Sequence, residues 1–239
     1  METLHGFDER VGEFQVNSVP GEPVFGLPAS LEEKVMPRVG VLRPFYGDTI
    51  AYFLDDRVRE LAGEIAHDLH GRFGESLSRP LPIEMAHVTL HDLHAGPDRA
   101  QVWPLVEADA GKAAELVARA RAVGPIRTRC TTVFNLVNTS VVVGIRAADE
   151  DEHRKLLSAR ALFDEIVPSG PFTPHITLAY YRPTAPTPLA PGALRAALSE
   201  FTARVTGTPV MLAPERLHVL HFDSMGNYWP AQLLPLAPS

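Results

Sequence analysis

Apolar and polar positions alternate along two short stretches of the chain, residues 86–90 and 174–178. Alternation of this kind, carried by β-branched residues, is typical of a strand with one buried face. Both stretches contain His-x-Thr-Leu, so the histidine and the threonine stand at positions i and i+2 and leave the same face of the strand. Each stretch therefore predicts a strand that is anchored in the core and presents an imidazole beside a hydroxyl.

Helical periodicity accompanies both strands. Four apolar residues from Val58 to Leu69 recur at spacings of three and four behind Asp55 or Asp56, which predicts a capped helix over residues 56–73. The order strand, helix, His-Thr strand occurs from Thr49 and again from Ser140, which indicates a structural repeat. The other predicted elements are strands near 49–54, 126–134, 140–146, 208–213, 216–222 and 228–235, and helices near 111–122, 149–166 and 192–203.

Residues 1–45 differ from the rest of the chain in being rich in proline and glycine, with little apolar periodicity. We expect an irregular N-terminal extension there. Its one helical candidate begins at Ser30, with Glu33 three residues later as in a capping box, and ends before Pro37. Residues 46–239 are expected to form a single domain of the α+β class, because no linker or low-complexity tract divides them.

Composition and charge narrow the classes of function. The chain of 239 residues carries a net charge of −7, which argues against a broad nucleic-acid surface and favours a small or short ligand. Cys130 is the single cysteine, so the chain can form neither an internal disulfide nor a cysteine-rich zinc module. No long apolar run and no secretory pattern is visible. We therefore expect a cytoplasmic, soluble protein without a membrane partner, and a monomer.

The two motifs, His87-Val88-Thr89-Leu90 and His175-Ile176-Thr177-Leu178, lie 175 − 87 = 88 residues apart. With them, and with the closing 217–228 segment, the chain resembles the 2H phosphoesterase superfamily, which includes the 2'-5' RNA ligase-like proteins and cyclic nucleotide phosphodiesterases. The resemblance covers roughly residues 46–239. It implies a bilobal α+β fold with two pseudo-symmetric lobes, mainly antiparallel sheets around a central cleft, one motif per lobe, and no need for a metal or other cofactor.

The chemistry of the motif residues also follows from the residues themselves. Cleavage of a phosphodiester needs one group that takes a proton from the attacking oxygen and another that protonates the leaving oxygen, and an imidazole can serve either role near neutral pH. We therefore assign His87 and His175 as the acid/base pair. Thr89 and Thr177 are expected to donate hydrogen bonds to the phosphate. The sequence does not decide which histidine is the base.

Other side chains are secondary candidates for the site. Arg182 could add a charged donor to the phosphate, although an exposed loop arginine is the more ordinary interpretation. Tyr180, Tyr181 and Tyr228 are candidates to stack on a base, since stacking tolerates any nucleobase, but aromatic residues in such positions commonly belong to the core.

Three classes of function remain open at this stage. The first is a metal-independent phosphodiesterase that acts on a small nucleotide or a short RNA end, at a 2',3'-cyclic phosphate or a 2'-5' linkage. The second is a metal-dependent hydrolase, because His87, His91 and His94 are spaced four and three and would share one face of a helix, with Asp92 nearby. It requires a helix where Val88 to Leu90 favours a strand. The third is a nucleotide-binding module without turnover.

Overall fold

The computed structural model describes residues 1–16, 19, 26–187 and 189–231. Its eight strands form one sheet in the order β6-β3-β4-β5-β2-β1-β7-β8, and all the strand pairs are antiparallel. The α+β class and the mainly antiparallel sheet predicted from the sequence are confirmed. The strands are β1 (Tyr46–Phe53), β2 (His87–Gly96), β3 (Ile126–Leu136), β4 (Ser140–Ala147), β5 (His175–Tyr180), β6 (Pro209–Leu212), β7 (Leu217–Ser224) and β8 (Asn227–Pro230).

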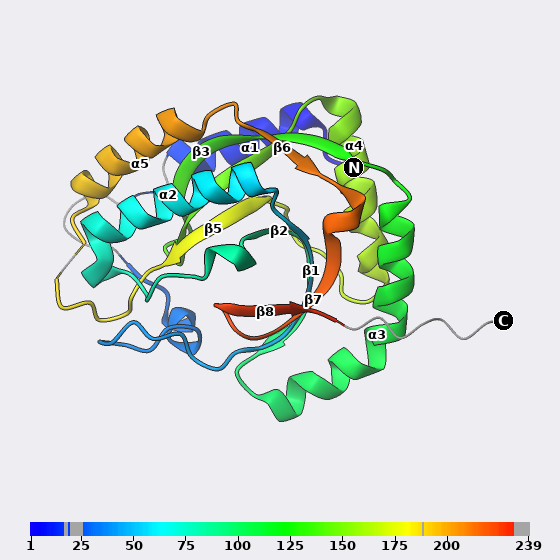
Figure 1. The fold of residues 1–239 in the computed structure, drawn as a ribbon, viewed down its shortest axis with the longest axis horizontal. Helices are drawn as coiled ribbons and strands as arrows, with labels where there is room; N and C mark the ends of the chain where they lie inside the picture. Colours follow the sequence, from blue (N-terminus) through cyan, green and yellow to red (C-terminus); the bar gives the residue numbers. More distant parts are fainter. Residues whose placement is uncertain (17–18, 20–25, 188, 232–239) are drawn as a thin grey trace.

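The two His-Thr strands, β2 and β5, are neighbours at the middle of this sheet. Four strands thus lie on each side of the β2–β5 boundary, and the units β1-α2-β2 and β4-α4-β5 repeat the same order across it. The predicted repeat is confirmed. The two halves share one curved sheet (Figure 1), and their join is narrow, because the register of β2 against β5 contains the single pair Val88↔Ile176.

Helices cover both faces of the sheet. The α-helices are α1 (Leu4–Val16), α2 (Asp56–Phe73), α3 (Arg99–Arg121), α4 (Glu150–Ala161) and α5 (Pro191–Val205). Helices α3 and α4 pack on one face, against β1, β2, β4 and β7, whereas α2 packs on β5 and α5 on β3 (Figure 1). None of the described helices combines the length and the apolar character that crossing a membrane requires.

The apolar partners of the motifs lie in the core, as the alternation predicts. Val88, Leu90, Ile176 and Leu178 are at most 2% exposed and belong to one cluster shared by both halves of the sheet. Helix α2 begins where its cap predicts, since the Asp55 carboxylate accepts a hydrogen bond from the backbone N–H of Val58. Each His-Thr strand buries two of these aliphatic side chains, which stabilise it by about 2 kcal/mol per side chain and so anchor the histidine.

The N-terminal segment corrects one expectation. Residues 1–45 are not irregular throughout, because α1 occupies residues 4–16. Its Leu4, Phe7 and Val11 are buried against Ala147. Asp8 forms a bidentate ion pair with Arg146, in which both carboxylate oxygens accept from the guanidinium. The three apolar residues form a helical pattern of only about two turns, which is too short to stand out among polar neighbours.

The remaining differences concern the ends of elements. Helix α3 begins at Arg99 behind the Asp98 cap and not near residue 111, and it contains Pro104 in its interior. The expected helix at Ser30 is a 3₁₀ turn, η1 (Ala29–Glu33). Helix α4 ends at Ala161, and the turn η4 (Leu162–Glu165) continues it. Strand β8 ends at Pro230, and residues 232–235 of its predicted range lie outside the described residues.

Candidate functional site

A cavity of about 340 Å³ lies over the middle of the sheet, and all four motif side chains line it. The antiparallel pair Val88↔Ile176 determines their arrangement. In an antiparallel register His87 stands opposite Thr177, and Thr89 stands opposite His175. The two histidines are then diagonal neighbours on one face, with Cα atoms about 7–8 Å apart. The two motifs, distant in the sequence, are thus brought together around one space large enough for a phosphate with its substituents.

The two imidazoles are held in the same way. Nδ1 of His87 lies 2.7 Å from the backbone oxygen of Met85, and Nδ1 of His175 lies 2.7 Å from the backbone oxygen of Thr173. A carbonyl oxygen only accepts, so Nδ1 carries the hydrogen in each ring. Each neutral ring therefore keeps a lone pair on Nε2, which is the atom that can take up a proton from a bound ligand.

Burial in the cavity lowers the pKa of both histidines. The backbone hydrogen bonds to Met85 and Thr173 oppose the shift, as does the Asp92 carboxylate, while His175 lowers the pKa of His87 further. The lowered pKa favours the neutral form of both imidazoles at pH 7. An anionic ligand would raise both pKa values, because a nearby negative charge favours the imidazolium.

A β-bulge in β2 adds Asp92 to the cavity and removes His91 from it. Thr89 pairs with Ala51 and His91 pairs with Ile50, so Leu90 is the extra residue and the alternation of faces shifts after it. His91 is consequently 1% exposed on the other face, where its Nε2 lies 3.3 Å from the Asp164 carboxylate. Asp92 lines the cavity with the motif residues.

The same geometry bears on the metal hypothesis. His87, His91 and His94 lie on a strand and not on a helix, and they do not converge. Nε2 of His94 lies 2.8 Å from the Asp109 carboxylate of α3. In the part of the chain that the structure describes, no group of three or more His, Cys, Asp or Glu side chains is placed to hold a metal ion.

Of the secondary candidates predicted from the sequence, two line the cavity and two do not. Tyr180 and Tyr228 line it, and the Tyr228 ring is tilted against His87 with centroids 4.7 Å apart. Tyr181 is fully buried in the core and does not line the cavity. Arg182 is directed to the backbone oxygen of Glu75, 3.3 Å from Nη1, and is also not among the lining residues.

Two arginines hold the residues that precede His175. Arg10 of α1 donates to the backbone oxygen of Phe172 at 2.7 Å and to the Thr173 hydroxyl at 3.3 Å. Arg160 of α4 places its guanidinium 4.3 Å from the centroid of the Phe172 ring and donates to the backbone oxygen of Leu90 in the bulge. Arg160 thus links the bulge of β2 to the entrance of β5.

Three ionisable residues of the cavity, Lys34, Asp48 and Asp92, were not predicted from the sequence as site residues. In the sequence, Asp92 stood out only beside the three histidines of the possible metal site. Strict strand alternation from His87 would place the Asp92 side chain on the face opposite to the cavity. Lys34 comes from the N-terminal segment, and its side chain lines the cavity beside Phe45. Leu90 and His91 are two consecutive buried residues, which marks the bulge in β2. This sign depends on burial in the structure and is not present in the sequence pattern.

Comparisons with known proteins were made by sequence and by structure. No protein-family model and no curated protein sequence matches the chain. A crystal structure of a conserved protein of unknown function from Agrobacterium tumefaciens matches with a TM-score of 0.60 at 16% identity, covering 86% of this chain and 92% of that chain. The two chains share a fold.

Two further solved structures are similar at lower scores. LigT of E. coli, in its apo form, matches with a TM-score of 0.45 at 19% identity, covering 79% of this chain and 95% of LigT. A protein described as a phosphoesterase matches with a TM-score of 0.44 at 18% identity, covering 79% of this chain and 94% of that chain.

Proposed function

We propose that the protein is a phosphodiesterase that cleaves a small nucleotide or RNA-end phosphodiester, at a 2',3'-cyclic phosphate or a 2'-5' linkage, by acid/base catalysis with His87 and His175 and without a metal. One observation carries the proposal. The two imidazoles lie in one cavity, and each donates Nδ1–H to a backbone oxygen at 2.7 Å, which leaves both Nε2 atoms available to a ligand.

The reaction needs two proton transfers, and the pair supplies both. Nε2 of one imidazole takes the proton of a water as the water oxygen attacks phosphorus. The other ring, as imidazolium, gives its Nε2 proton to the leaving oxygen as the phosphorus–oxygen bond breaks. The bound phosphodiester supplies the negative charge that allows one of the two neutral rings to hold this proton. Thr89 and Thr177 donate hydrogen bonds to the phosphoryl oxygens, where charge gathers in the transition state.

The cavity suits one nucleotide end better than a long strand. Its volume of about 340 Å³ is at the small end of ligand sites, and the net charge of −7 opposes an extended phosphate backbone. Tyr180 and Tyr228 are the residues that we propose to contact the base or ribose, whereas Tyr181 and Arg182 do not line the cavity. The LigT structures with phosphate, 3'-AMP, ATP and NADP+ suggest ligands with which to begin.

The test is an assay of the purified protein on 2',3'-cyclic nucleotides and on 2'-5'-linked and 3'-5'-linked dinucleotides, each with and without a chelator. Turnover of a cyclic or 2'-5' substrate that the chelator leaves unchanged, and that His87→Ala and His175→Ala abolish, supports the proposal. Turnover that the chelator abolishes supports the metal-dependent alternative. Binding of these ligands without turnover of any of them supports a nucleotide-binding module.

A further inference from the structure

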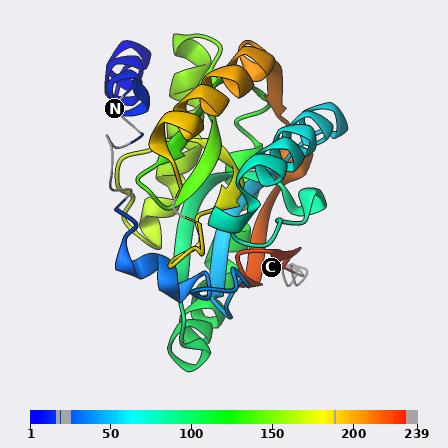
Figure 2. The same cartoon turned by 90° about the vertical axis from the view of Figure 1, so that its left-hand side faces the viewer.

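The segment from residue 29 to residue 45, drawn in blue in Figure 2, contributes Lys34 and Phe45 to the lining of the cavity. Leu31 and Val35 are at most 1% exposed in the main core cluster, and Val35 forms an isolated bridge with Leu42. Lys34 lies between these two anchors, with its backbone oxygen accepting a hydrogen bond from the N–H of Arg43 at 2.8 Å. The backbone of Lys34 is thus held on both sides, so its side chain enters the cavity from a defined position.

The Lys34 ammonium has an environment that is unusual for a lysine. It lies 5.0 Å from the centroid of the Phe45 ring, and within the described residues no carboxylate lies within 4 Å of it. Burial lowers its pKa, and the carboxylates of Asp92 and Glu33 oppose this shift. A half-buried ammonium without an ion pair has lost part of its hydration and keeps unused donors. Such a group favours the entry of an anion.

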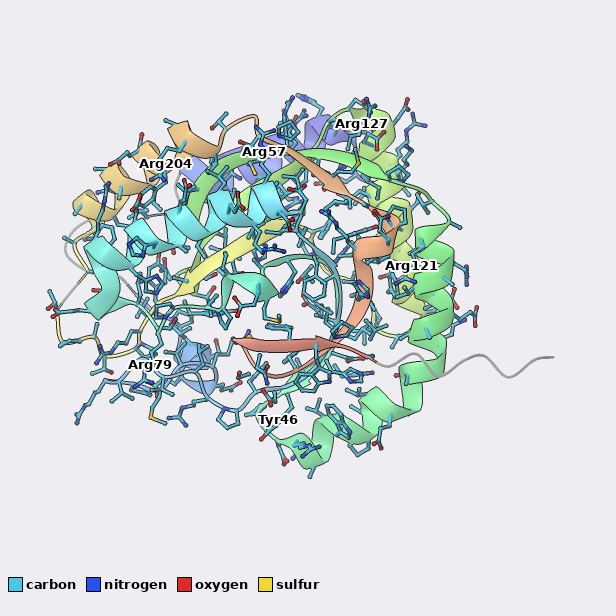
Figure 3. The ribbon with its side chains drawn as sticks, in the orientation of Figure 1. Tyr46, Arg57, Arg79, Arg121, Arg127 and Arg204 are labelled. Atoms are coloured by element: carbon cyan, nitrogen blue, oxygen red, sulfur yellow. The ribbon has the colours of Figure 1, made fainter. Side chains whose placement is uncertain are left out.

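Lys34 also differs from the other basic residues in its position. Of the lysine and arginine side chains in the described part of the chain, it is the one that lines the cavity. Arg79, Arg121, Arg127 and Arg204, for example, lie around the outside of the molecule (Figure 3). Burial favours the neutral form of the motif histidines, and their threonine neighbours carry no charge. A phosphodiester that enters this cavity therefore meets a single fixed cation.

The Asp92 carboxylate connects Lys34 to the histidines. All four residues line the same cavity, and the negative charge of Asp92 favours the protonated forms of Lys34, His87 and His175. Its negative charge also opposes that of a phosphate. Lys34 and Asp92 thus place opposite charges in the cavity that also contains the proposed acid/base residues.

We infer that Lys34, supplied by the N-terminal segment, binds the phosphate charge of the ligand, and that Asp92 opposes it and limits the negative charge that the site accepts. This inference rests on the proposed function. It gives the segment 29–45 a role in ligand binding, which the 2H motifs alone do not imply. It also predicts that a ligand with one phosphate group is preferred to a polyphosphate.

The experiment measures binding and not turnover. The affinities of inorganic phosphate, 3'-AMP and ATP are determined by calorimetry for the wild type and for Lys34→Met, Lys34→Arg, Asp92→Asn and the control Lys112→Met. Methionine keeps an unbranched side chain without the charge, and Lys112 forms an ion pair with Glu165 outside the cavity. Thermal unfolding of each variant verifies that the fold is retained.

We expect Lys34→Met to weaken phosphate and 3'-AMP binding by about 10-fold to 100-fold, which is the loss of one hydrogen bond to a charged group. Lys34→Arg should retain most of the affinity, Lys112→Met should leave it unchanged, and Asp92→Asn should tighten ATP binding more than 3'-AMP binding. Equal affinities of the wild type and Lys34→Met would overturn the inference while leaving the proposed function intact. A wild type that binds none of the three ligands also overturns the inference, and the turnover assay on cyclic and 2'-5'-linked substrates tests the proposed function separately.

Discussion

His87 and His175 are diagonal neighbours on adjacent antiparallel strands, and each donates Nδ1–H to the backbone oxygen of the residue two positions before it. This equivalence follows from the repeat, because each histidine is the first residue of its strand. Two rings with the same tautomer and the same kind of support can exchange the roles of acid and base. The side of the phosphate on which the leaving group lies then decides which ring is which.

The pH dependence of turnover follows from this pair. Burial lowers the pKa of both imidazoles in the free protein, so the form with one proton on the pair is most populated below the usual histidine pKa of about 6.5. We expect kcat/KM to be bell-shaped with its maximum below that pH, and kcat to peak at a higher pH, because the bound phosphate raises both pKa values. Initial rates from pH 4 to pH 9 test this. A kcat/KM maximum above the usual histidine pKa of about 6.5 would be inconsistent with acid/base catalysis by these two histidines.

Removal of the motif side chains should affect the rate to different extents. His87→Ala and His175→Ala should each lower kcat by at least about 100-fold, and the double variant should lose little more than the weaker single variant, because the two groups act in one transition state. Thr89→Val and Thr177→Val should each cost about 2–4 kcal/mol of transition-state stabilisation. Single-turnover rates measure these losses. Wild-type turnover by either histidine variant would exclude the two-histidine mechanism.

Arg160 should matter for both stability and activity. Its guanidinium stacks on Phe172 and donates to the oxygen of Leu90, so Arg160→Met should lower the free energy of unfolding by about 1–3 kcal/mol and reduce turnover by displacing the histidine strands. Urea unfolding and kcat provide the measurement. Arg154→Met on the same helix is the matched control, because it breaks an exposed pair with Asp151 and should change stability by less than about 1 kcal/mol.

The Asp48 carboxyl should make stability depend on pH. Burial raises its pKa to about 6, with the backbone N–H of His94 opposing the shift. Since the folded state then keeps its proton longer than the unfolded state, the contribution of Asp48 to the free energy of unfolding falls as the pH rises from about 4 to about 6. Asp48→Asn, whose amide oxygen can still accept from His94, should be more stable than the wild type by about 2–3 kcal/mol at pH 8 and equal to it near pH 3.

The comparison needs urea unfolding of both proteins at the two pH values. Asp56→Asn serves as the control, because the Asp56 side chain is 84% exposed and its substitution should give no such difference. An Asp48→Asn variant that is less stable than the wild type at pH 8 would show that the ionised carboxylate is stabilised by the fold.

Much of this protein was readable from local sequence pattern. The alternation around His87 and His175 indicated two strands with an imidazole and a hydroxyl on one face, and the repeated order of elements indicated that the two strands are equivalent. A cap for α2 at Asp55 or Asp56 was likewise visible, because capping and periodicity depend on residues within one or two turns, and the structure shows that Asp55 is the cap. The structure confirms these elements and places both motifs in one cavity.

Other features were decided by tertiary structure alone. The bulge at Leu90 reverses the faces of β2, so that Asp92 enters the cavity while His91 leaves it, and this depends on pairing with β1. Lys34 reaches the site from more than 50 positions before His87 because Leu31 and Val35 are buried in the shared core. Arg182, seven residues after His175, lies outside the cavity. A side chain's direction follows from strand period only while the register is regular, and contacts between distant segments follow from packing.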